Sequence, residues 1–379
     1  MDVNVLLTLG ILLLFAKVFG EIAERLSVAS LVGEVIAGIV LGPILGWVVL
    51  NEFLSEFMIL GIIFLLLMAG LEVKADDIKK NTYVASILAI SGGLLSFFLG
   101  FFVGMIFFND ILTSIAIGIV LISTNNGTLF MILMKIGEFN SKIGRTIVSI
   151  TIADDVVGIL ILSFFTMYVT QNKFSFNDAW YLFLLSIGFY LIMLTAGSKI
   201  ANKLLDIFGF FRNEYILFSI PIVITFILAY VTENLGISLA VGAFLAGVAM
   251  ANSKFTESII RPKIEIISYG FLIPLFFASI GTMLVFKDLN IILIIAIVLA
   301  AILGKFIGCG MLSRFFGYTW DEIKLIGLSM MPRGNENIVF VQIILMLGVI
   351  TMQVYTSIVF SMVLTVILAP ILLKIFYKS

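Results

Sequence analysis

Four groups of polar residues interrupt the apolar stretches of this 379-residue sequence. Asp154 and Asp155 are adjacent in the run TIADDVVGIL, and Lys305 lies in the run AILGKFIGCG. Two further stretches mix polar residues with Gly or Pro, at 123–128 (STNNGT) and at 332–337 (PRGNEN). Carboxylates hold protons, and carboxylate, amide and hydroxyl oxygens are ligands for small alkali cations. These residue types therefore indicate a binding site for cations or protons.

The composition indicates that these polar groups lie within a membrane. The sequence is 62% hydrophobic and only 12% charged, and its mean hydropathy is +1.24. A soluble domain carries about 25% charged residues. The apolar runs are continuous over about 20 residues, the length that a helix needs to cross a bilayer. Because a spanning backbone must satisfy its own hydrogen bonds, and these runs do not alternate as barrel strands do, we predict an all-α integral membrane protein.

Two aspartates in one spanning helix need compensation. They cost about 5–7 kcal/mol at the bilayer centre, and the apolar residues of the same span offset roughly that amount. Consecutive helical residues point about 100° apart, so Asp154 and Asp155 face different neighbours. One can pair with a cation from another helix, for which Lys305 is the natural partner, while the other faces an open cavity. Ion pairs that serve packing alone are the plainer alternative.

The two mixed stretches predict interrupted helices. Thr-Asn-Asn-Gly is a poor helix interior and Pro-Arg-Gly breaks a helix. Unwound backbone at membrane depth is tolerated only where it lines a cavity or is buried in protein. We expect Thr124 and Asn125 to complete an oxygen shell around an ion that Asp155 holds. The other polar residues are expected to support the breaks, and they are Asn126, Arg333, Asn335 and Glu336.

Two plainer interpretations of the second stretch stay open. In the first, Pro332 produces an ordinary helix kink. In the second, Arg333 and Glu336 neutralise each other, because they are three residues apart on one helix face.

Hydropathy and polar breaks predict about thirteen spans. Two inverted six-helix repeats joined by a linker helix would account for that number, as in many secondary transporters. Of the 22 Lys and Arg residues, 17 then fall on one side of the membrane and 2 on the other. Because cytoplasmic loops are enriched in Lys and Arg, we predict an outside N-terminus and a cytoplasmic C-terminus. The spans are expected near 4–22, 28–50, 54–71, 83–108, 111–134, 144–169, 180–205, 213–231, 236–252, 264–285, 290–313, 322–348 and 353–375.

Six stretches carry a family pattern, in order, along nearly the whole chain. They are LVGEVIAGIVLGP (31–43), FLLLMAGLEV (64–73), IGR…ADDVVGI (143–159), ISLAVGAFLAGVAMANS (237–253), PLFFASIGTML (274–284) and MPRG (331–334). They resemble the cation/proton antiporter superfamily, in the branch of Kef-type and NapA-type proteins. The resemblance implies an NhaA/NapA-like fold of thirteen helices in which two discontinuous helices cross, and a homodimer.

The resemblance also implies a division into domains. A dimer domain would contain the spans at about 1–75 and 210–288. A core domain that moves against it would contain the spans at about 80–170 and 289–379, and the linker helix would lie at about 178–206.

Carried over by position, the resemblance assigns roles to individual residues. Asp155 resembles the principal cation and proton site, Asp154 resembles the partner of the core lysine, here Lys305, and Thr124 resembles a threonine beside the crossing. An Asp-Asp pair is typical of the electrogenic sodium/proton antiporters, whereas Kef-type systems carry Gln-Asp and many electroneutral exchangers carry Asn-Asp. Two departures lie beside the binding site and concern its ion preference. Asn-Asn follows Thr124 where the family has Ser-Val or similar, and Asn-Glu-Asn follows Pro-Arg-Gly where the family has Glu-Val-Gly.

We expect a secondary active transporter, and not an enzyme, that exchanges Na+ or Li+ for H+ across the plasma membrane by alternating access and serves pH homeostasis. A cavity-facing Asp155 can hold a proton or a cation but not both, which couples the two fluxes. Proton release from Lys305 as Na+ enters would move about two protons per Na+ and make exchange electrogenic. The expected partners are Na+ or Li+, H+, the lipid bilayer and a second copy of the chain, without cofactor or nucleic acid. Three alternatives stay open: a K+/H+ antiporter, a Kef-like K+ efflux protein and a sodium-coupled symporter of organic anions.

Overall fold

The computed structural model describes residues 3–26, 28–73, 75–139, 141–170, 188, 192–208, 214–234, 239–287 and 289–376. Within these ranges the regular structure is entirely helical, with no strand. Eight helices in the described ranges are long and apolar enough to cross a membrane, and shorter apolar helices accompany them. The prediction of an all-α, multi-pass membrane protein is confirmed. The exact number of thirteen spans and the inverted-repeat arrangement stay predictions.

One group of helices comes from residues 3–72 and 214–283. Its members are α1 (Val3–Arg25), α2 (Ser30–Ile39) with η1 (Val40–Ile44), α3 (Glu52–Glu72), α10 (Glu214–Asn234), α11 (Leu239–Met250), η3 (Thr256–Ile260), α12 (Arg261–Ile267), η4 (Ser268–Leu272) and α13 (Ile273–Met283). Within it, α3 packs against α11 and α13, and α2 packs against α1 and α13. Small residues permit this approach, as in many membrane helix pairs. A Cβ added at Gly70 would lie 2.1 Å from the carbonyl oxygen of Phe244.

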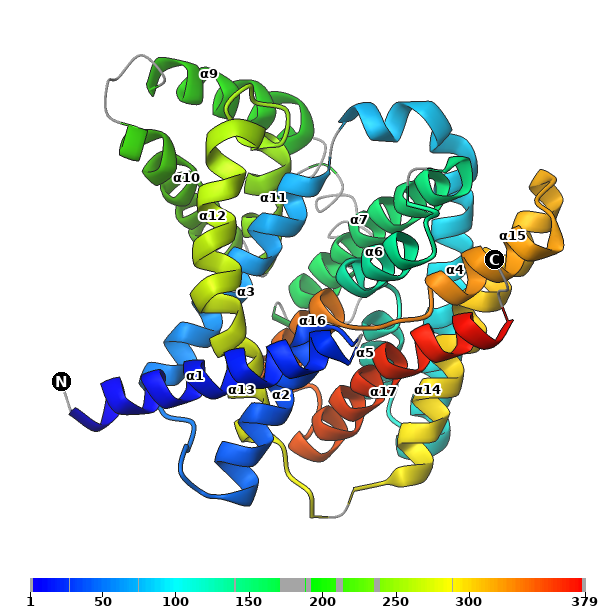
Figure 1. Ribbon diagram of the computed structural model, residues 1–379, viewed down its shortest axis with the longest axis horizontal. Helices are drawn as coiled ribbons and strands as arrows, with labels where there is room; N and C mark the ends of the chain where they lie inside the picture. The colour runs from blue at the N-terminus through cyan, green and yellow to red at the C-terminus, as the bar shows by residue number, and fades with distance from the viewer. Residues whose placement is uncertain are drawn as a thin grey trace.

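A second group comes from residues 75–170 and 291–376. Its members are α4 (Ala75–Phe108), α5 (Ile111–Val120), α6 (Asn126–Lys135), α7 (Lys142–Thr170), α14 (Ile291–Lys305) with η5 (Phe306–Gly310) and η6 (Met311–Phe316), α15 (Trp320–Ser329), α16 (Asn335–Met346) and α17 (Met352–Phe376). In this group α4 packs against α5, α7 and α14, and α14 packs against α17. Figure 1 shows α3, α10, α11 and α12 on the left of the view and α4, α6, α7 and α14 on the right. The groups meet where α16 packs against α3.

The predicted linker helix falls only partly on described residues. Its first part, 178–187 and 189–191, lies outside them. The later part is helical, with η2 (Met193–Gly197) followed by α9 (Ser198–Phe208). An ion pair of 2.8 Å between Asp206 Oδ1 and Lys254 Nζ joins α9 to the connection that follows α11.

Both predicted helix interruptions are present. The first separates α5 from α6, and the second separates α15 from α16. Asn125 Oδ1 caps α6 by accepting a hydrogen bond of 3.0 Å from Thr128 N. The breaks lie directly against each other, because Asn125 N donates to Pro332 O at 2.9 Å. A Cβ at Gly334 would lie 1.6 Å from Asn125 Nδ2, so the second break has no room for a side chain there.

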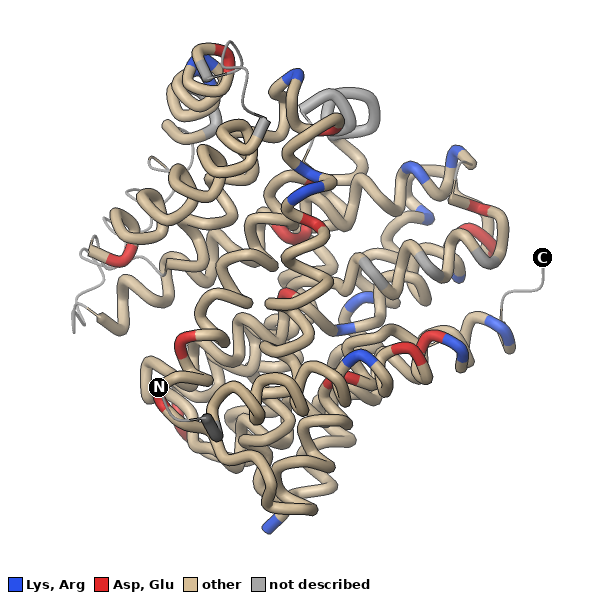
Figure 2. The backbone as a smooth tube through the Cα atoms, turned by 60° about the vertical axis from the view of Figure 1, so that its left-hand side comes forward, with Lys and Arg blue, Asp and Glu red and all other residues tan. Residues whose placement is uncertain are grey.

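The charged residues are distributed unevenly over the molecule. Figure 2 shows Lys and Arg mainly toward the top and right of the view, on the side where the C-terminus lies, with few toward the bottom. The two termini lie at opposite sides of the molecule in Figure 1. An odd number of spans would place them on opposite sides of a membrane.

Candidate functional site

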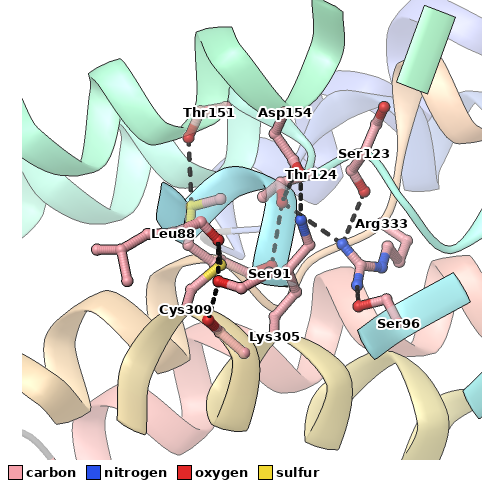
Figure 3. Close-up of polar contacts among 12 residues, drawn as sticks. Leu88, Ser91, Ser96, Ser123, Thr124, Thr151, Asp154, Lys305, Cys309 and Arg333 are labelled. Carbon is pink, nitrogen blue, oxygen red and sulfur yellow. Dashed lines mark hydrogen bonds and ion pairs between the residues drawn. The ribbon is translucent and has the colours of Figure 1, made fainter. Parts of the chain in front are cut away.

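The two acidic residues of α7 have different surroundings, and Asp154 is the one with a complete set of partners. Its Oδ1 accepts a hydrogen bond from Lys305 Nζ, and both side chains are fully buried. Its Oδ2 accepts a hydrogen bond of 2.9 Å from Thr124 Oγ1. Figure 3 shows Lys305 reaching toward Asp154, with Thr124 beside them. The predicted partners Asp154 and Lys305 therefore lie together, at a point where each carboxylate oxygen is already bonded.

Arg333 is buried and donates to uncharged groups. Its Nη1 donates to Ser123 O at 2.7 Å and to Thr124 Oγ1 at 3.4 Å. Its Nη2 donates to Ser96 Oγ and to Ala301 O, both at 3.2 Å. These bonds tie the second break to the first break, to α4 and to α14, as Figure 3 shows in part. Arg333 thus bonds to the first break while it belongs to the second.

The alternative in which Arg333 and Glu336 neutralise each other is wrong. The guanidinium of Arg333 points into the packed interior, toward the partners just given. Glu336 instead lines a cavity, and its Oε2 is buried without a hydrogen-bond partner in the described part of the chain. The separation has a simple cause: α16 begins only at Asn335, so these two residues do not share a helix face.

Asp155 lies on the other face of α7, is only 4% exposed and has one free oxygen. Its Oδ2 accepts a hydrogen bond of 2.7 Å from Asn126 Nδ2. Its Oδ1 is buried and has no hydrogen-bond partner among the described residues. The neighbour of Asp155 is therefore Asn126, whose expected role was support of the break. Thr124, which we expected around Asp155, contacts Asp154 instead, and the Asn125 side chain caps α6.

A cavity of about 770 Å³ opens beside Asn126. Its walls come from α1, α2, α3, α12 and α13 on one side and from α6 and α16 on the other. Asn125, Asn126, Asn335 and Glu336 contribute from the two breaks. The charged residues of its lining are Glu21, Glu24, Glu34, Glu72, Glu265 and Glu336, with Lys17 and Arg261. Acidic groups outnumber basic ones, so the cavity favours cations over anions.

The wall opposite the breaks contains residues that the sequence analysis did not single out. Arg261 Nη2 pairs with Glu72 Oε1 at 3.2 Å, and Lys17 Nζ donates to Tyr269 O. Glu34 is buried in α2 and faces the cavity. An acidic residue inside the apolar run LVGEVIAGIVLGP was a visible signal for it. The Arg333 partner Ser96 carried no such signal, because an isolated serine is common in membrane helices.

Buried oxygens without hydrogen-bond donors occur in the cavity wall and on Asp155, which bonds to the cavity-lining Asn126. Within the described ranges they include Oδ1 of Asn126, Oδ1 of Asp155, Oδ1 of Asn335 and Oε2 of Glu336. A buried acceptor without a partner costs about 1–3 kcal/mol. A proton or a cation placed among these oxygens would remove that cost. Chemically, the arrangement suits reversible binding of a small positive ion.

An acidic cavity that ends at two touching, interrupted membrane helices defines the chain as a member of the ion-transporting class of membrane proteins. The family described as "Sodium/hydrogen exchanger, transmembrane" matches residues 10–378, and the chain belongs to this family. The resemblance to cation/proton antiporters is thereby confirmed. The family consists of transporters rather than enzymes.

Relatives and a solved structure agree with this family. The chain is 27% identical over 377 residues to the Na(+)/H(+)-K(+) antiporter GerN of Bacillus cereus, covering 99% of this chain and 96% of GerN. It is 27% identical over 372 residues to a Na(+)/H(+) antiporter of Enterococcus hirae, with 97% of each chain covered. Its fold is similar to that of the sodium proton antiporter MjNhaP1 from Methanocaldococcus jannaschii, with a TM-score of 0.74 at 19% identity, covering 98% and 96% of the two chains. Together these findings support cation/proton exchange as the class of activity.

Proposed function

We propose that this protein exchanges Na+ or Li+ for H+ across the plasma membrane, with Asp155 as the shared cation and proton site. One observation carries the proposal. Asp155 keeps one buried carboxylate oxygen without a hydrogen-bond partner among the described residues, beside the cavity-lining Asn126. Asp154 offers no such oxygen, because Lys305 and Thr124 occupy both of its oxygens.

Coupling follows from competition at this carboxylate. A carboxylate in a low-dielectric site is stabilised by a proton or by a metal cation, and binding of either one weakens binding of the other. Protons in excess on one side displace Na+, and Na+ in excess on the other side displaces protons. Exchange requires that the loaded site be exposed to each compartment in turn.

The buried pair supplies a route to electrogenic exchange. Asp154 and Lys305 form one buried, ion-paired unit. Entry of Na+ at the neighbouring Asp155 disturbs this unit, and loss of the Lys305 proton would bring the exchange to about two protons per Na+. Net charge then moves with each cycle.

The arrangement of helices supports alternating access between two domains. The proposed dimer domain (about 1–75 and 210–288) and core domain (about 80–170 and 289–379) correspond to the two packed groups, and the cavity lies between them. Movement of the core domain would open the inner end of the cavity to the opposite compartment. The homodimer, the linker helix at about 178–206, the outside N-terminus and the cytoplasmic C-terminus belong to the same proposal.

Potassium is the second candidate cation. The printed name of GerN includes K+ as well as Na+. The site of this chain also departs from the family pattern at Asn125, Asn126 and Asn335, close to Asp155. A K+/H+ antiporter, or a Kef-like K+ efflux protein, would use the same acidic cavity.

Proton flux in sealed proteoliposomes tests the proposal. Stepwise addition of NaCl, LiCl and KCl to acid-loaded vesicles should dissipate the pH gradient with Na+ and Li+ and much less with K+. Asp155→Asn should abolish the response, whereas Asp321→Asn, which removes an exposed carboxylate of α15, should retain it. Responses to organic anions without any response to alkali salts would contradict antiport.

A further inference from the structure

We propose that Glu336 is a second carboxylate ligand of the transported cation, so that the site holds the ion between Asp155 and Glu336. This inference rests on the proposed function at Asp155. It goes beyond that function because it assigns the ion to two acidic residues from different halves of the chain. From the sequence we expected Glu336 only to support the break.

The position of Glu336 fits a ligand better than a structural support. It lies in the first turn of α16, is 4% exposed and lines the cavity. Its Oε2 is buried and accepts no hydrogen bond within the described part of the molecule. Arg333, the basic residue nearest to it in sequence, donates to Ser123, Thr124, Ser96 and Ala301 instead. Its Oε2 is therefore available to a ligand that enters the cavity.

Neutral oxygens from both breaks accompany the two carboxylates. Oδ1 of Asn126, in the first turn of α6, and Oδ1 of Asn335, in the first turn of α16, are both buried without a partner in the described ranges. The backbone hydrogen bond from Asn125 N to Pro332 O holds the two breaks together. Asn126, Asn335 and Glu336 line the cavity, and Asp155 is bonded to Asn126, so two carboxylates and two amide oxygens lie in or beside its wall. Hard oxygens of this kind are the ligands that alkali cations prefer.

Charge balance also assigns a role to Glu336. Asp154 and Lys305 neutralise each other, and Arg333 carries one positive charge. With Asp155 and Glu336 both ionised, these five residues sum to one negative charge, which one monovalent cation cancels; Glu34, which is also buried, belongs to the opposite wall of the cavity. Without Glu336 the same residues sum to zero, and an added cation would remain an uncompensated buried charge.

The two carboxylates also act on each other. Asp155 bonds to Asn126, which lines the same cavity as Glu336, so the two buried carboxylates belong to one region of the molecule. Two carboxylates that repel each other in a buried site relieve the repulsion by binding a cation or a proton. The arrangement therefore favours the loaded site over the empty one.

The test compares Glu336 variants of the full-length protein in proteoliposomes. The initial rate of proton efflux is measured against Na+ concentration for wild type, Glu336→Gln, Glu336→Asp and Asp155→Asn. Glu336→Gln should raise the apparent KM for Na+ on the order of 10- to 100-fold, the range seen when the shell of a metal site is altered. Glu336→Asp should recover part of this loss, because it restores the charge. The control Asp321→Asn removes an exposed carboxylate of α15 that does not line the cavity, and it should stay within about twofold of wild type.

A second readout separates binding from transport. The melting temperature of the detergent-solubilised protein is recorded with increasing NaCl, using choline chloride to keep the ionic strength constant. A bound ion stabilises the folded protein by mass action, so the Na+ concentration needed for a given stabilisation should rise in Glu336→Gln. If Glu336→Gln is not recovered in folded form, Glu336→Asp decides with both readouts, and it should raise the apparent KM several-fold.

The outcomes distinguish the two proposals. The ligand role of Glu336 would be overturned if the Glu336 variants kept the wild-type KM and the wild-type stabilisation by Na+. The proposed function would remain intact if Asp155→Asn were inactive in the same experiment. Absence of alkali-dependent proton flux in the wild-type protein would overturn the proposed function itself. In that case the melting temperatures would still test the cation site. Loss of the Na+-dependent stabilisation in Glu336→Gln would support a cation site at Glu336, and unchanged stabilisation in this variant would overturn that site.

Discussion

Lys305 forms its buried ion pair with Asp154, while the adjacent Asp155 bonds to the uncharged Asn126. Two neighbouring carboxylates on one helix are thereby divided between two environments. Asp154 is held by charge in the packed interior, whereas Asp155 keeps an oxygen without a partner among the described residues. This division allows one residue to organise the core while the other binds an ion.

Loss of the Lys305 ammonium should reduce both stability and current. Lys305→Gln leaves the Asp154 charge buried without its partner, which costs about 3–5 kcal/mol. Thermal unfolding in detergent should show the loss, and the double variant Asp154→Asn with Lys305→Gln should recover much of it, because no lone charge remains. Transport current on a solid-supported membrane should fall in Lys305→Gln. An unchanged current at equal protein density would rule out the proposed role of this lysine in electrogenic exchange.

Arg333 should be irreplaceable by lysine. A lysine has no planar fork and cannot reach Ser123 O, Ser96 Oγ and Ala301 O together. Arg333→Lys should lower the free energy of unfolding by at least about 3 kcal/mol, because several buried bonds to a charged donor are lost. Ser96→Ala removes one of these bonds and should cost only about 1 kcal/mol. Equal stability of Arg333→Lys and wild type in thermal unfolding would contradict this account of the crossing.

Gly334 should tolerate no side chain. The Cβ of Gly334→Ala would lie 1.6 Å from Asn125 Nδ2, so the Asn125 side chain that caps α6 must move, at a cost of about 1–3 kcal/mol. Exchange activity and folded yield should both fall. The control Gly10→Ala places its Cβ in α1, where nothing lies within 4 Å, and should be neutral or slightly stabilising. Wild-type exchange in Gly334→Ala would show that the breaks need not touch.

We expect a pH effect on stability at Asp110, which lies outside the spanning helices, in the connection between α4 and α5. Its carboxylate caps α5 by accepting a hydrogen bond of 2.8 Å from Thr113 N, and this bond lowers the pKa of Asp110 below its usual value. The contribution of this cap to the free energy of unfolding is fully present when the pH is above the ordinary carboxyl pKa. It is lost as the pH falls through the lowered pKa of Asp110. Asp110→Asn keeps a capping oxygen that does not titrate. The melting-temperature difference between wild type and Asp110→Asn should therefore shrink on acidification, and a growing difference would contradict the assignment.

Much of the site could be predicted from residue types in a rare context. Charges and helix breakers are so costly at membrane depth that Asp154, Lys305 and the stretch around Pro332 were conspicuous. The interrupted helices lie where Asn125 and Gly334 indicated them. The resemblance to antiporters then gave the family.

The details that depend on one helical step could not be predicted. The first residue of α6 determines whether Asn125 or Asn126 reaches Asp155. The sequence is compatible with both starting positions. The start of α16 at Asn335 likewise directs Glu336 into the cavity and away from Arg333, although their spacing is compatible with an ion pair on a continuous helix. These choices depend on contacts between the two breaks, which lie far apart in sequence.

Proton release on sodium binding tests the central claim most directly. Purified protein in detergent is placed in a weakly buffered solution near neutral pH, and NaCl is added while the pH is recorded. A shared site at Asp155 predicts that Na+ displaces protons from the wild-type protein, that choline chloride does not, and that Asp155→Asn releases none. Equal proton release from wild type and Asp155→Asn would contradict the claim that one carboxylate carries both ions.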